Sequence, residues 1–144
     1  MFPLLAAASQ IDLRGGRGGR VEDRGVVVIM SSCASMHNAT NVDLTSYATS
    51  KAATDHSVRL LAANYARFYV RVVGMNPGFA PSSMNPVGAE GIVFSTLFDR
   101  VPAKRAGSEQ DIAGTVLYLV SKAGAYVDKA SLCVDGDRVL VANG

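Results

Sequence analysis

The sequence has little of several features that mark specialised protein classes. Its only two cysteines, Cys33 and Cys133, have neither the spacing of a metal site nor that of a disulfide framework, which favours a reducing compartment. No apolar run is long enough to span a bilayer. The apolar stretch at residues 1–8 has no basic region before it and contains Pro3, so it does not match a signal peptide. These absences predict a soluble, cytoplasmic protein without a metal site.

Charge is also scarce. The net charge is +2, and only 18% of the 144 residues are charged. Much of the positive charge lies in a Gly/Arg-rich run at residues 14–24, where no aromatic residues are interleaved as in nucleic-acid-binding arms. We therefore expect neither a nucleic-acid nor a membrane partner. Residues 1–25 are interpreted as a residual helix and a flexible loop, followed by one folded unit from 26 to 144.

Three apolar runs predict strands. Residues 26–30 and 70–73 are rich in β-branched side chains and uninterrupted by polar ones, which is typical of parallel strands covered on both faces. Residues 132–134 form a shorter third run, and Asn76-Pro77-Gly78 ends the second sharply.

Helices are expected between these strands. Residues 46–68 carry a broad apolar stripe that includes Val58, Leu60 and Ala62. Ser108 begins a capping-box pattern for a helix through Lys122, and a short helix is expected at 88–98. The alternation predicts an α/β fold: a Rossmann-like, half doubly wound parallel sheet of about three strands with flanking helices.

One side-chain combination points to acid–base chemistry. Tyr47 and Lys51 are four residues apart on the predicted long helix, so they share one face. A nearby cation lowers the pKa of a phenol, which makes the pair a usable general acid and base. Ser32 follows the first strand, at the edge of the sheet where parallel α/β proteins bind ligands, and its hydroxyl could hold a substrate oxygen beside the tyrosine.

Taken together, these motifs resemble the short-chain dehydrogenase/reductase family, and most of all the C-terminal half of its ketoacyl-reductase-like members. The matching stretches are VVVIMSS (26–32), SYATSKAA (46–53), VRVVGMNPGFAPSSM (70–84), VPAKRAGSEQDIAGTVLYLVSKAGAY (101–126) and LCVDGD (132–137). The resemblance implies that Ser32 binds the substrate oxygen, that Tyr47 is the proton donor and that Lys51 lowers the tyrosine pKa. It also implies that Pro77, Gly78 and Ser82 contact the nicotinamide end of a bound nucleotide.

The sequence also departs from the family pattern. The family's glycine-rich phosphate turn between a strand and a helix is absent, because the glycines at 15–19 neither follow a strand nor open a helix. The usual Asp-Gly-Gly near the end reads Asp135-Gly136-Asp137, and the usual Thr-Gly before the last strand reads Asp128-Lys129. The chain is therefore interpreted as a family member truncated before its nucleotide-binding half.

Three functions remain open at this point. The favoured one is a cofactor-independent acid–base enzyme, in which Tyr47, Ser32 and Lys51 isomerise, cyclise or dehydrate a small apolar carbonyl or hydroxy compound. The second is an NAD(P)H-dependent oxidoreductase half that another chain completes, and the third is a non-catalytic interaction module or pseudoenzyme. No cofactor is expected for the isolated chain, and NAD(P)H only with a complementing half. Because an apolar edge strand cannot stay exposed, we expect a homo-oligomer or a complementing chain.

Other polar residues near Ser32 are weaker candidates. His37 could relay protons, although a solvated loop histidine is the preferred interpretation. Asp43 lies in the same loop and could take over the chemistry if Tyr47 is not the catalyst. Cys33 could be a reactive thiol, but a small buried residue is the preferred interpretation.

Overall fold

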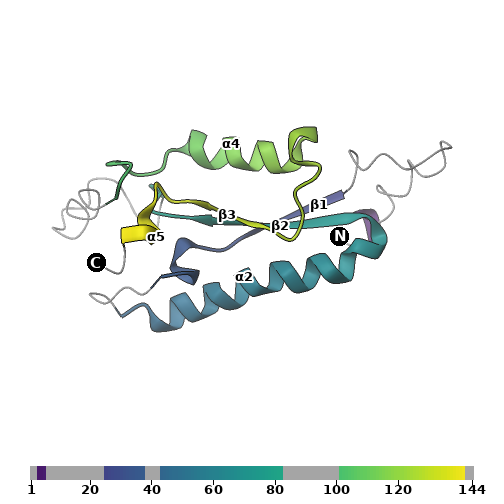
Figure 1. Ribbon diagram of the computed structural model, residues 1–144, viewed down its shortest axis with the longest axis horizontal. Coiled ribbons are helices and arrows are strands. Elements are labelled where there is room, and N and C mark those ends of the chain that lie inside the picture. Colours follow the sequence, from purple (N-terminus) through teal and green to yellow (C-terminus); the bar gives the residue numbers. More distant parts are fainter. Residues whose placement is uncertain (1–2, 6–24, 38–42, 83–100, 142–144) are drawn as a thin grey trace.

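The chain folds into three layers in the computed structural model, which describes residues 3–5, 25–37, 43–82 and 101–141. A parallel sheet lies in the middle, with one long helix on each face (Figure 1). This arrangement confirms the predicted partial Rossmann-like α/β fold. Most of the predicted Gly/Arg-rich loop and all of the short helix predicted at 88–98 lie outside the described residues.

The sheet contains three strands in the order β1 (Gly25–Met30), β2 (Val70–Pro77) and β3 (Ser131–Val134). All pairings are parallel, with Val27 opposite Val72 and Gly74 opposite Ser131. The apolar runs in the sequence therefore predicted all three strands, but β2 is longer than predicted, because its pairing with β3 continues through Asn76 and Pro77. Because the carboxyl ends of parallel strands lie at one edge, the polar residues that follow β1 and β2 are brought to the same side of the molecule.

Burial differs sharply between the strands. β2 is buried along nearly its whole length, and its Val72 packs with Val58 and Ala62 in a cluster of the hydrophobic core. β1 is only half-buried, because one side of it pairs with β2 and its other side pairs with no strand in the described part of the chain. The outer edge of β1 thus presents unpaired backbone groups and apolar side chains.

One face of the sheet is covered by α2 (Thr45–Tyr65), which continues as the 3-10 turn η4 (Ala66–Phe68). The sequence predicted a single helix to residue 68, but the last turn tightens and Tyr69 then takes a left-handed backbone with φ 55°. The predicted apolar stripe is only partly correct, since Leu60 stays 54% exposed.

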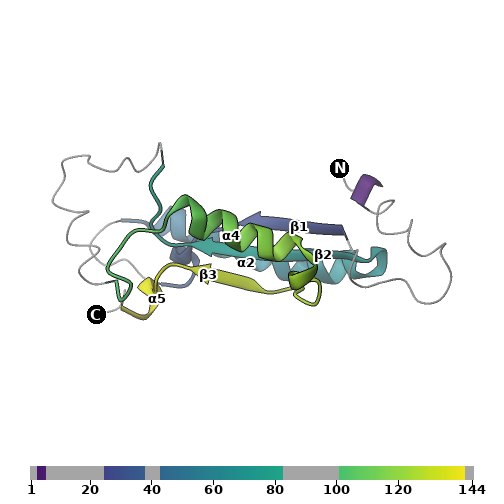
Figure 2. The same ribbon diagram turned by 90° about the horizontal axis from the view of Figure 1, so that it is seen from above.

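The other face is covered by α4 (Glu109–Val120), which crosses above β1 and β2 in Figure 2. Its predicted capping box is present: the Ser108 hydroxyl accepts from the Asp111 backbone N–H, and the Asp111 carboxylate accepts from the Ser108 N–H. The helix ends before the predicted Lys122, which begins the 3-10 turn η5 (Lys122–Gly124). A short helix, α5 (Arg138–Val141), follows β3. None of the described helices has the length and apolarity that a bilayer crossing requires.

Candidate active site

Ser32 lies two residues after the end of β1, at the carboxyl edge of the sheet. Its backbone is extended, and it caps the 3-10 turn η3 (Cys33–Ser35), because its Oγ accepts from the Ala34 N–H at 3.2 Å. The side chain is half-buried, so it is not sealed in the core. The structure therefore places Ser32 at the edge of the sheet where the sequence predicted it.

Tyr47 and Lys51 lie one turn apart near the beginning of α2. The Lys51 Nζ lies 5.6 Å from the centroid of the Tyr47 ring, so the predicted phenol and ammonium are brought together. Tyr47 is 41% exposed, and Lys51 is half-buried. A cation at this position can stabilise negative charge that develops on the phenol oxygen.

The helix that carries this pair is tied to the end of β1 by Ser31. Its Oγ donates to the Lys51 carbonyl oxygen at 2.8 Å, and the residue is only 5% exposed. The two adjacent serines therefore differ in role: Ser31 points inward and holds α2, whereas Ser32 caps η3. Sequence reasoning passed over Ser31, although the alternation of neighbouring side chains at a strand end predicts that only one of two serines can face the site.

Asp55 forms a second polar connection one turn after Lys51. Its carboxylate accepts from Asn76 Nδ2 at 3.0 Å and from Arg59 Nη1 at 3.1 Å. Burial raises the pKa of Asp55, but the nearby Ser131 hydroxyl, the Asn76 amide and the Arg59 guanidinium outweigh it and hold that pKa below its usual value. The carboxylate thus stays charged although it is 7% exposed. This residue was not singled out from the sequence.

The three predicted nucleotide-contacting residues line one cleft on the α4 side of the sheet. The cleft has a volume of about 520 Å³ and is lined by Pro77, Gly78 and Ser82, together with Met30 and the first turn of α4. Gly78 must be a glycine here, because a Cβ on it would lie 2.7 Å from the Asp135 Cα. Ser32, Tyr47 and Lys51 do not line this cleft, whereas Met30, two residues before Ser32, does.

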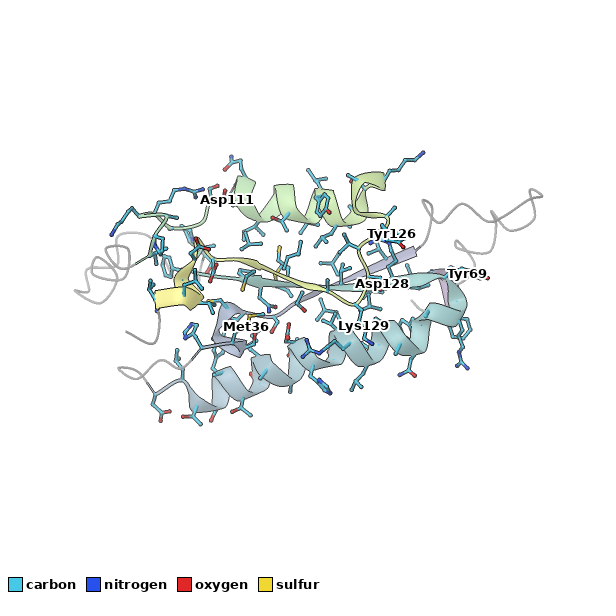
Figure 3. All side chains as sticks on the ribbon, viewed as in Figure 1. Met36, Tyr69, Asp111, Tyr126, Asp128 and Lys129 are labelled. Carbon is cyan, nitrogen blue, oxygen red and sulfur yellow. The ribbon has the colours of Figure 1, made fainter. Side chains whose placement is uncertain are left out.

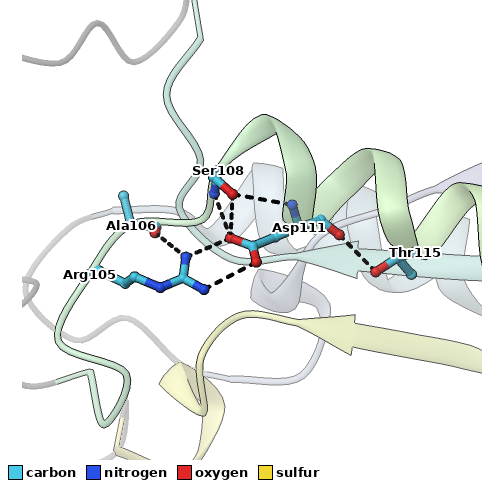
Figure 4. A network of polar contacts seen from close by, with 5 residues as sticks. All are labelled: Arg105, Ala106, Ser108, Asp111 and Thr115. Carbon is cyan, nitrogen blue, oxygen red and sulfur yellow. Dashed lines mark hydrogen bonds and ion pairs between the residues drawn. The ribbon is translucent and has the colours of Figure 1, made fainter.

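A polar network holds the loop before α4 in place (Figure 4). The Arg105 guanidinium binds both oxygens of the Asp111 carboxylate, and Arg105 also donates to the Ala106 carbonyl oxygen at 2.9 Å. The same carboxylate accepts from the Ser108 N–H at 2.7 Å. Arg105 therefore holds the pKa of Asp111 well below its usual range. The network fixes the first turn of α4, which forms one wall of the cleft.

The structure also shows the surroundings of the three weaker candidates from the sequence: His37, Cys33 and Asp43. His37 is buried, contrary to the preferred interpretation of a solvated loop residue, and its Nε2 lies 3.7 Å from the Cys33 thiol. Burial raises the pKa of Cys33, which argues against a reactive thiol at neutral pH. Asp43 accepts from the Thr45 N–H at 3.2 Å just before α2. Among the described residues, no three His, Cys, Asp or Glu side chains lie close enough together to hold a metal ion.

Comparison with known proteins identifies the family. The family model described as enoyl-(acyl carrier protein) reductase matches residues 16–136. The chain belongs to the short-chain dehydrogenase/reductase family. A member of this family from Stachybotrys chartarum, SAT3, is 32% identical over 96% of this chain and 54% of its own length. The 7α-hydroxysteroid dehydrogenase of Escherichia coli is 33% identical over 83% of this chain and 46% of its own length.

A solved structure supports the assignment of this chain to the short-chain dehydrogenase/reductase family. A 7α-hydroxysteroid dehydrogenase complexed with NADH and 7-oxo glycochenodeoxycholic acid superimposes with a TM-score of 0.69 and 33% identity. The match covers 81% of this chain and 46% of that one. The chain thus spans about half the length of the curated relatives it matches.

These relatives correct the favoured functional expectation. They are named dehydrogenases and reductases, and one of them is solved with NADH. A cofactor-independent isomerase, cyclase or dehydratase is therefore the wrong interpretation, and the oxidoreductase alternative agrees with the comparisons. The absence of the phosphate turn does not exclude a cofactor, because a nucleotide can be bound by residues other than those that carry the acid and base.

Proposed function

We propose that this chain supplies the substrate-binding and proton-transferring half of an NAD(P)H-dependent oxidoreductase that interconverts a small-molecule carbonyl and its alcohol. The observation that carries the proposal is the pairing of Tyr47 and Lys51 on α2, which Ser31 ties to the strand end that bears Ser32. This arrangement joins a proton donor, a cation and a hydroxyl at the carboxyl edge of a parallel sheet, where this class of fold binds its ligands.

Each of the three side chains has a distinct task in this proposal. The Ser32 hydroxyl donates a hydrogen bond to the substrate carbonyl oxygen and so orients it. The Tyr47 hydroxyl donates a proton to that oxygen during reduction and takes it back during oxidation. The Lys51 ammonium stabilises the negative charge that remains on the Tyr47 oxygen. Tyr47 is exposed enough to meet a substrate from solvent.

The cleft on the α4 side suits the nicotinamide end of the cofactor. A nicotinamide cofactor supplies the hydride in such reactions. Its ring needs a largely apolar pocket with close backbone approach, and the residues lining the cleft provide both: Pro77, Met30 and Ile112 are apolar, and Gly78 leaves room that a Cβ would fill. Ser82 offers a hydroxyl at the rim. These residues would hold the nicotinamide, while the adenosine half would be bound by residues outside 25–141.

The exposed edge of β1 fits a complementing unit. The strand is half-buried from Gly25 to Ile29, and its outer backbone groups face no strand in the described part of the chain. An apolar parallel strand in that position needs a neighbour. We therefore propose that further polypeptide, whether a second copy or a nucleotide-binding half, covers this edge.

A complementation assay tests the proposal. The full chain is mixed with the separately produced part of the Escherichia coli 7α-hydroxysteroid dehydrogenase that lies outside the matched region, and NADH consumption is followed with a panel of small ketones. We expect turnover only when both parts are present. The chain alone should bind NADH weakly, because its sequence has no glycine-rich turn between a strand and a helix.

Two tyrosine variants decide whether the site is the assigned one. Tyr47→Phe removes only the ionisable hydroxyl and should abolish turnover, whereas Tyr126→Phe, at a position that is 98% exposed, should leave it unchanged. Full turnover in Tyr47→Phe would show that Tyr47 is not the proton donor. Tight NADH binding to the isolated chain would contradict the division between the two halves.

A further inference from the structure

A buried amide and a buried carboxylate meet one helical turn beyond Lys51 of the proposed acid–base pair. Asn76 is fully buried at the end of β2, and Asp55 lies on α2, one turn after Lys51. The Asn76 Nδ2 lies 3.0 Å from the Asp55 carboxylate and 3.4 Å from the Ser35 Oγ in η3. One amide therefore contacts both the helix that carries Tyr47 and the turn that Ser32 caps.

Stability alone does not account for this pair. A buried carboxylate loses hydration, and well-packed apolar side chains at the same positions are often equally or more stable. The neighbouring contacts of α2 with the sheet, through Val58 and Ala62, are apolar and therefore non-directional. Hydrogen bonds are directional, so the Asp55–Asn76 bond defines one position of the helix along its axis.

Because Asp55 lies on the same helix as Tyr47 and Lys51, its position along α2 also sets theirs. Tyr47, Lys51 and Asp55 follow one another at intervals of four residues in one unbroken helix, so they lie along the same side of it. Each residue of slip moves a helix by about 1.5 Å, and a displacement of about 1 Å can cost 10²-fold in rate. The Ser31–Lys51 hydrogen bond alone fixes only one point on the helix.

Asn76 is also next in sequence to two residues that line the proposed nucleotide cleft. It immediately precedes Pro77 and Gly78, both of which line the cleft. The Gly78 N–H donates to the Val134 carbonyl oxygen at 3.0 Å, which fixes the corner after Asn76 to β3. Asp55, whose carboxylate accepts a hydrogen bond from Asn76, therefore helps to position both the acid–base pair and the Pro77–Gly78 corner of the proposed nucleotide cleft.

We propose that Asp55 and Asn76 are positioning residues that fix α2 against β2 and η3, so that Tyr47 and Lys51 face Ser32 and the Pro77–Gly78 corner. The inference rests on the proposed function for the roles of these site residues. Its structural content, that the pair sets the environment of Tyr47, can be measured without any turnover.

The first experiment observes Tyr47 in the full 144-residue chain by NMR, with isotope-labelled tyrosine rings. The Tyr47→Phe variant assigns the ring signal. Asn76→Asp places two carboxylates against each other and should shift or broaden the Tyr47 signal, and Asp55→Asn with Asn76→Asp restores an amide–carboxylate pair and should return the signal. Val58→Ala serves as the matched control, because it weakens the core one turn further along α2 without changing a polar group.

The second experiment measures kcat and KM in the complementation assay. Asn76→Asp should lower kcat by on the order of tenfold or more with little change in KM, and the double exchange should recover most of it. Val58→Ala should lower the melting temperature at least as much as Asn76→Asp, with kcat nearly unchanged.

The outcomes separate the two proposals. An unchanged Tyr47 signal in Asn76→Asp, or an equal change in Val58→Ala, refutes the positioning role whatever the activity shows. A double exchange that fails to return the signal also refutes it. Full turnover in Tyr47→Phe instead refutes the proposed function and leaves the NMR result to decide the positioning of α2.

Discussion

Replacing Lys129 by glycine is expected to stabilise the chain. Lys129 has a left-handed backbone with φ 61°, in the segment between η5 and β3. Its side chain is exposed, and its N–H donates to the Val72 carbonyl oxygen at 2.9 Å, a bond that a glycine keeps. Figure 3 shows Lys129 beside Asp128 near the amino end of the sheet, away from Met36, so the substitution leaves the proposed site untouched.

The magnitude follows from two opposing effects. A left-handed backbone costs a residue with a Cβ roughly 1–2 kcal/mol. The greater conformational freedom of glycine in the unfolded chain offsets about 0.4–1 kcal/mol of this gain in stability. With the middle value of each range, the free energy of unfolding should therefore rise by about 0.8 kcal/mol. With a urea dependence of about 1–3 kcal/mol per molar, the midpoint should rise by a few tenths molar.

Urea unfolding followed by far-ultraviolet circular dichroism measures this midpoint. The matched control is Lys122→Gly, which changes another exposed lysine within the right-handed turn η5 and should lower the free energy of unfolding by about 0.5–1 kcal/mol. Opposite signs for the two variants support the reasoning. A lower midpoint for Lys129→Gly as well would show that its left-handed backbone carries no strain.

Three further outcomes follow from the structure. Gly74→Ala places a Cβ 2.3 Å from the Ser131 Oγ and should lower the free energy of unfolding by about 1–3 kcal/mol in urea, a loss that a second change, Ser131→Gly, should reduce. Ser31→Ala should cost about 0.5–1.5 kcal/mol of stability by the same measurement, whereas Ser32→Ala should mainly lower turnover in the complementation assay. Cys133 lies at the surface, but partial desolvation of its sulfur and the Asp135 carboxylate raise the pKa of the thiol to about 11. Alkylation of this thiol in a Cys33→Ser background should therefore be slow at neutral pH and accelerate until about pH 11, and a plateau below pH 9 would contradict this.

The strands and the start of α4 could be predicted because their signals are local. The apolar run at residues 26–30 and the Ser108–Asp111 capping box each specify a structure within a few residues. The end of α2 could not be predicted, because it depends on Tyr69 taking a left-handed backbone, a conformation that tyrosine rarely prefers. His37 is buried, and no local pattern in the sequence marks it as such.

The same distinction between local and long-range signals applies to the site residues. Tyr47 and Lys51 share a face by helical spacing alone, so their proximity follows from the sequence. Asn76 and Asp55 are 21 residues apart and meet only after α2 packs on β2, so no local pattern marks them. At the two late departures from the family pattern, Lys129 and Asp137 both have a positive φ, a backbone that suits the glycine of that pattern better than the residue present here.

Under the proposed function, the described residues define the acid–base side of the site and only part of its nucleotide side. The acid–base side is fixed by hydrogen bonds within the described residues, from Ser31 to Lys51 and from Asn76 to Asp55. The nucleotide side depends on the Pro77–Gly78 corner and on whatever covers the outer edge of β1. Under the proposed function, separating the complementing unit should therefore weaken cofactor binding first, while Tyr47 and Lys51 keep their relative positions.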